Sequence, residues 1–139
     1  MPAVQPYETM ISSVSFHPFL SHLPIALYIG ALGLLYKNRA QKNTLSGQAA
    51  SFNLSLGFIG AAMADFTGMI SADINLTPNV EVEGHQGYSF LFTCLIGVAT
   101  VYSFTRANTQ TAVGVYIAGF LALCASAFSG YLLAFPPHL

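Results

Sequence analysis

TAVGVYIAGFLALCASAFSGYLLAF, residues 111–135, runs for 25 residues without a charged side chain. At about 1.5 Å of rise per residue, a helix of this length crosses the roughly 30 Å hydrocarbon core of a bilayer. Three further apolar runs precede it, at about residues 15–36, 49–72 and 86–105. The sequence therefore predicts an all-α fold, an integral membrane four-helix bundle.

The composition of the whole chain agrees with a membrane protein. Hydrophobic residues make up 54% of the 139 residues and charged residues only 6%, against about 25% charged residues in a typical soluble domain. The formal net charge of −1 argues against electrostatic binding of nucleic acid. We expect a single transmembrane domain over residues 1–139 that is embedded in the lipid bilayer.

Charged residues are distributed unevenly among the connections between the runs. All four basic residues lie in the first and third connections: Lys37, Arg39, Lys42 and Arg106. The second connection is acidic and carries Asp73, Glu81 and Glu83. Because basic connections tend to stay in the cytoplasm, we expect a multi-pass protein of the bacterial inner (plasma) membrane. Both termini would then lie outside, in the periplasm of a Gram-negative cell.

The second and fourth apolar runs contain a repeat. Residues 57–72 read GFIGAAMADFTGMISA, and residues 119–134 read GFLALCASAFSGYLLA. Five positions are identical without gaps, and Thr67 matches Ser129 in kind. In the first and third runs, His17 pairs with His85. The repeating unit would be a helical hairpin with a histidine at its outer end, and two such hairpins would be related by a pseudo-twofold axis along the membrane normal.

Three histidines lie at the outer ends of the apolar runs: His17 and His22 in the first, His85 in the third. Ionisable groups near or within a bilayer are costly and tend to mark functional sites. On a helix, His17 and His22 are about 140° apart, so the natural partner of either is His85 on another helix. Facing helices of four-helix bundles can hold a b-type haem between two histidines. His17, His22 and His85 are therefore the candidate cofactor ligands.

Asp65, within the second run, is a further candidate. An intramembrane carboxylate needs a partner, and His22 is the best candidate because the two residues lie at similar depth. Asp65 could orient a liganding His22, form a proton site with it, or stay protonated and bond to a backbone carbonyl. Haem propionates would find no Lys or Arg on the outer side. A divalent ion such as zinc or non-haem iron, bound by His17, His22, His85 and Asp65, is therefore an alternative to haem, as is a site without any cofactor.

The stretch HPFLSHLPIAL, residues 17–27, carries a resemblance. It is similar to the first-helix signature His-Pro-x-x-x-His-x-Pro-Ile-Ala-Leu of a family of predicted bacterial four-helix membrane proteins of unknown function. Weaker matches are the segment from Gly68 to Asp73, His85, and Ser129-Gly130. The resemblance spans about residues 15–135 and implies a membrane haem or redox protein. The chain departs from the family pattern around His22 and in the long acidic connection before His85.

We therefore predict a small polytopic membrane subunit that binds a b-type haem or a metal at its outer side and serves electron transfer. We expect it not to be an enzyme, because the sequence shows no recognisable reaction motif. The expected partners are other membrane-protein subunits of a redox complex. The alternative is a cofactor-free structural or accessory subunit of a larger respiratory or photosynthetic complex, which the small extramembrane mass favours.

Overall fold

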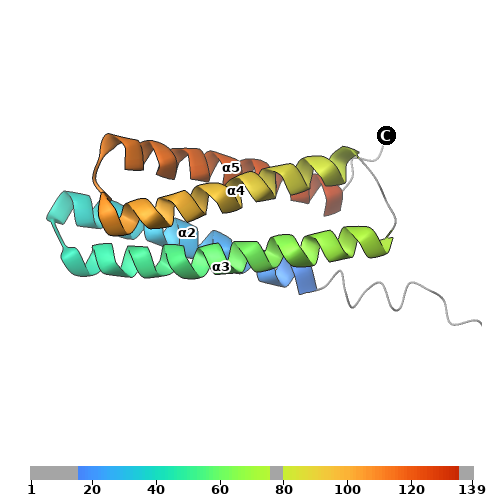
Figure 1. Cartoon of the computed structure of the whole chain (residues 1–139), viewed down its shortest axis with the longest axis horizontal. Helices are drawn as coiled ribbons and strands as arrows, with labels where there is room; N and C mark the ends of the chain where they lie inside the picture. The colour runs from blue at the N-terminus through green and yellow to red at the C-terminus, as the bar shows by residue number, and fades with distance from the viewer. Residues whose placement is uncertain (1–15, 76–79, 135–139) are drawn as a thin grey trace, which may run out of the picture.

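The computed structural model describes residues 16–75 and 80–134. These residues form four α-helices: α2 (Phe16–Gln41), α3 (Thr44–Asn75), α4 (Val80–Thr105) and α5 (Gln110–Ala134). Helices α2 and α3 form one antiparallel hairpin, and α4 and α5 form a second hairpin beside it (Figure 1). The connection within each hairpin lies at the same end of the bundle (Figure 1). The predicted all-α four-helix bundle is confirmed.

Every helix contains a segment that is long and apolar enough to cross a membrane: Phe19–Gln41, Thr44–Ala72, Val80–Thr105 and Gln110–Ala134. The outward faces of these segments carry large apolar side chains, among them Phe66 and Phe128, which are 65% and 64% exposed. In water such a surface would be unfavourable, whereas lipid tails solvate it. The chain is thus a multi-pass membrane protein.

The helices extend beyond the apolar runs at their polar ends. Helix α3 begins at Thr44 and α4 at Val80, five and six residues before the starts expected from hydrophobicity. Asn43 caps α3, since its Oδ1 accepts a hydrogen bond from the Ser46 backbone N–H at 3.2 Å. Glu81 and Glu83 occupy the first turn of α4, where carboxylates interact favourably with the helix dipole. Helix capping and charge, and not hydrophobicity, therefore determine where α3 and α4 begin.

Two glycines allow the helices to approach closely in the core. A Cβ atom at Gly57 on α3 would lie 3.0 Å from Cδ1 of Ile96 on α4. A Cβ atom at Gly119 on α5 would collide with the hydroxyl of Tyr28 on α2. Gly57 and Gly119 are equivalent positions of the sequence repeat, and both Ile96 and Tyr28 are fully buried. The two hairpins therefore use the same device, a large side chain set against a glycine of another helix.

Candidate functional site

His17, in the first turn of α2, is held against α3. Its Nδ1 atom lies 3.0 Å from the Ala64 carbonyl oxygen and 3.3 Å from Thr67 Oγ1. A carbonyl oxygen only accepts hydrogen bonds, so Nδ1 carries the proton and donates it. The ring lies tight against Gly68, where an added Cβ would be 2.9 Å from His17 Cε1. His17 is thus fixed in one tautomer and one orientation.

His85, near the start of α4, is held against α5 in the same way. Its Nδ1 atom lies 3.1 Å from the Ser126 carbonyl oxygen and 3.0 Å from Ser129 Oγ. A Cβ atom at Gly130 would be 2.9 Å from His85 Cε1. The Ser126 side chain is also engaged, with its Oγ 2.8 Å from Ser89 Oγ on α4. The same reasoning assigns the proton to Nδ1 of His85.

The two histidine environments are equivalent by the sequence repeat. The ungapped alignment of residues 57–72 with 119–134 places Ala64 opposite Ser126, and it also matches the hydroxyl and glycine positions, Thr67 with Ser129 and Gly68 with Gly130. The structure shows each of these pairs making the same contact with its own histidine. The predicted hairpin repeat thus has a structural counterpart at the histidines. The sequence matched Thr67 with Ser129 but did not indicate that either contacts a histidine. A hydroxyl residue followed by glycine, repeated at the depth of each histidine, could have indicated this contact.

The rings of the two anchored histidines contact each other edge to face between the hairpins. The centroids of the His17 and His85 rings are 6.3 Å apart, and the ring planes are nearly perpendicular at 82°. With Nδ1 protonated, the lone pair of a neutral imidazole is on Nε2. Two imidazoles that share one metal through bonds of about 2.0–2.1 Å place their ring centroids roughly 6 Å apart. The observed separation is close to that value, and the two rings contact each other edge to face.

His22 does not share the environment of these two rings. Its side chain is exposed on α2, as the rotation of about 140° from His17 requires. Within residues 16–75 and 80–134, no group of three or more His, Cys, Asp or Glu side chains could hold one metal ion. Of the candidate ligands, the structure brings together His17 and His85, and it does not gather His22 and Asp65 with them into a larger ligand set.

Asp65 has a different hydrogen-bond partner from the one expected. The half-buried carboxylate accepts a hydrogen bond of 2.7 Å from the Thr93 hydroxyl, which links α3 to α4. Asp65 therefore links α3 to α4, next in the chain to Ala64, whose carbonyl oxygen accepts the His17 hydrogen bond. The expected pair with His22 relied on depth alone and stays a prediction.

Comparison with known proteins found no matching protein family, no matching curated protein and no matching solved structure. The family resemblance of residues 17–27 stays a prediction.

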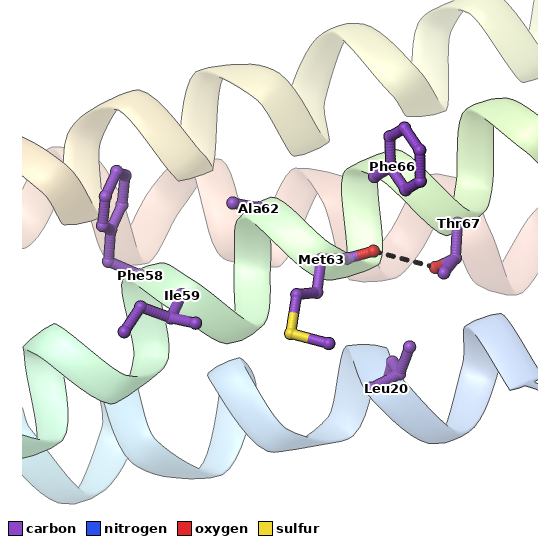
Figure 2. Close-up of a pocket in the computed structure, with 7 residues that line it drawn as sticks. All are labelled: Leu20, Phe58, Ile59, Ala62, Met63, Phe66 and Thr67. Carbon is purple, nitrogen blue, oxygen red and sulfur yellow. Dashed lines mark hydrogen bonds between the residues drawn. The ribbon is translucent and has the colours of Figure 1, made fainter.

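A shallow apolar groove lies beside His17 on the membrane-facing side of α3. It has a volume of about 400 Å³ and is lined by Leu20, Phe58, Ile59, Ala62, Met63, Phe66 and Thr67. Figure 2 shows that all but Leu20 project from one helix, with Thr67 bonded to the Met63 carbonyl oxygen at one end. Thr67 thus contacts both the groove and His17. Apart from the Met63 thioether, the groove is lined by apolar side chains and the Thr67 hydroxyl.

Proposed function

We propose that this protein binds one b-type haem between His17 and His85 and transfers electrons at the outer side of the bacterial inner membrane. The observation that carries the proposal is the pair of facing imidazoles, each anchored through Nδ1 to a carbonyl oxygen of its own hairpin. Metal-binding histidines use this arrangement, in which the second ring nitrogen donates to a carbonyl oxygen and orients the ligand.

The number of protein ligands favours haem over a bare metal ion. Structural zinc sites take four protein ligands and catalytic ones three, whereas haem iron receives four nitrogens from its own macrocycle and needs at most two from the protein. Among the described residues, His17 and His85 lie together and no group of three or more ligands is present. Such a pair fits haem better than it fits zinc or non-haem iron.

Haem, when bound, supplies one-electron redox chemistry, and this chain's residues prepare the site. The Ala64 and Ser126 carbonyl oxygens keep Nδ1 of each histidine protonated, so that Nε2 keeps the lone pair with which it would bind the haem iron. The Thr67 and Ser129 hydroxyls bond to the same Nδ1 atoms and restrict rotation of the rings. Gly68 and Gly130 leave the space that the rings occupy. No residue here is assigned a catalytic role.

The placement of the site at the outer side follows from charge. His17 and His85 lie near the starts of α2 and α4, whereas the α2–α3 and α4–α5 connections, with the basic residues in or next to them, lie at the opposite end of the bundle (Figure 1). With those connections in the cytoplasm, the site and both termini are periplasmic. Haem propionates would then be met by hydroxyls, backbone N–H groups or a partner subunit, since the outer end of the chain has no Lys or Arg.

A visible spectrum of the protein purified in detergent tests this function. We expect a sharp α-band after reduction with dithionite. His85→Ala should abolish the band, whereas the matched control His22→Ala, at an exposed position on α2, should retain it. Absence of the band, together with absence of bound metal in elemental analysis, would contradict the proposal. It would favour the cofactor-free accessory subunit, in which the histidine–carbonyl bonds only hold each hairpin together.

A further inference from the structure

Asn53 is a polar residue inside the membrane-spanning part of α3. It lies well within the apolar Thr44–Ala72 segment, and its side chain is partly buried. The nearby Ser55 hydroxyl is satisfied by its own helix, because it donates to the Ser51 carbonyl oxygen at 2.9 Å. Within the described part of the chain, the Asn53 amide makes no such hydrogen bond. An amide in a hydrocarbon environment is costly without a partner, so Asn53 calls for a polar group from another molecule.

Gly30 on α2 lies directly beside this amide. It is exposed near the middle of the Phe19–Gln41 segment, and a Cβ atom added there would be 3.4 Å from Asn53 Nδ2. Ala26, four residues earlier and on the same face of the helix, is exposed as well. Two small residues at this spacing allow another membrane helix to approach closely. A helix that packs against Gly30 therefore comes within reach of the amide.

The second hairpin has no equivalent of this pair. When the repeat is continued toward the starts of α3 and α5, the position that matches Asn53 is Val115, which packs against the apolar core. Gly97 matches Gly30 in the sequence, but a Cβ atom there would lie 3.0 Å from the Phe58 ring of α3. The exposed glycine beside an amide is thus a feature of the α2–α3 hairpin alone.

We propose that Gly30 and Asn53 form the interface of a homodimer within the membrane. Two copies inserted in the same orientation carry Asn53 at the same depth, and a twofold axis along the membrane normal brings the two amides together. Each amide contains both donors and acceptors, so the pair can form two reciprocal hydrogen bonds. A second copy therefore supplies the missing group exactly at the depth where it is needed, whereas a different subunit would need its own polar residue there.

The experiment measures self-association of the full-length protein, labelled with donor and acceptor dyes, by energy transfer in phosphatidylcholine vesicles. Asn53→Leu keeps the side-chain size and removes the amide. We expect it to raise the dimer dissociation constant about tenfold, for the loss of two hydrogen bonds between membrane helices. Gly30→Leu, which covers the amide, should weaken association at least as much. The matched control Ser55→Ala removes a hydroxyl that bonds within its own helix and should leave association unchanged.

Cross-linking locates the interface without a measurement of affinity. With Cys94 and Cys124 replaced by alanine, oxidation of Gly30→Cys should form a disulfide between two copies. Ile117→Cys, at an exposed position on α5, should not. A monomeric wild-type protein overturns the inference, as do equal association of the wild type and Asn53→Leu, or a cross-link through Ile117→Cys in place of Gly30→Cys. The haem band of the same samples tests the proposed function separately, since the interface does not include the histidines.

Discussion

The α2–α3 hairpin and the α4–α5 hairpin share one construction and differ in a few side chains. Each holds a histidine through a carbonyl oxygen, a hydroxyl and a glycine of its second helix. Asp65 belongs to the first hairpin alone, and the bond between the Ser89 and Ser126 hydroxyls belongs to the second. The shared features position the two histidines, and the differences make the two sides of the site chemically distinct. Equivalent substitutions in the two hairpins can therefore show which effects come from the shared contacts and which come from the differences.

The largest expected effect comes from the histidines. His17→Ala and His85→Ala should each abolish the reduced α-band, because the proposed haem would be held by both imidazoles. The effects should be equal if the hairpins contribute equally. Visible spectra of both variants provide the measurement. A band that survives in one variant and disappears in the other would show that only one hairpin supplies a ligand.

The second-largest expected effect comes from Gly68 and Gly130, the glycines that contact the histidine rings. A Cβ added by Gly68→Ala or Gly130→Ala would lie 2.9 Å from a ring carbon, so the imidazole must move. We expect each variant to lose more than tenfold in haem affinity, since displacement of a ligand ring weakens coordination. Haem titration of the apoprotein measures this loss.

Gly33→Ala is the matched control, because a Cβ atom at Gly33 would meet nothing within 4 Å. Its haem affinity should stay unchanged. If Gly33→Ala and the two ring-contacting variants lose affinity alike, the effect comes from helix stability and not from the histidine contacts.

The hydroxyls should have smaller and unequal effects. Outer-shell partners of metal ligands are commonly worth about 10–100-fold in affinity, and here each carbonyl oxygen remains after the hydroxyl is removed. We expect a loss of about tenfold for Ser129→Ala and a smaller loss for Thr67→Val. The physical reason is the distance to Nδ1, which is 3.0 Å for Ser129 and 3.3 Å for Thr67. Haem titrations that rank the two variants in the reverse order would contradict this interpretation.

The sequence was sufficient to predict four spanning helices and the hairpin repeat, because both can be recognised from the order of residues within each helix. It also identified His17 and His85 among the candidate ligands. It could not show that His17 and not His22 contacts His85, nor give Asp65 its partner Thr93. Those outcomes depend on how each helix is rotated about its own axis. Contacts between helices, such as Tyr28 against Gly119 and Ile96 against Gly57, decide that rotation, and no pattern within one helix encodes it.

The smallest expected effect tests a difference in the core. Tyr28 and Ile96 occupy equivalent, fully buried positions, but only Tyr28 donates a hydrogen bond, to the Tyr116 carbonyl oxygen at 2.8 Å. Hydrogen bonds between membrane helices are worth about 0.6 kcal/mol on average. Tyr28→Phe should therefore lower the free energy of unfolding in detergent by roughly that amount, and Ile96→Val by about 0.5–1.5 kcal/mol. Because the Tyr28 bond joins α2 to α5, a much larger loss in Tyr28→Phe would mean that this bond, and not apolar packing, holds the two hairpins together.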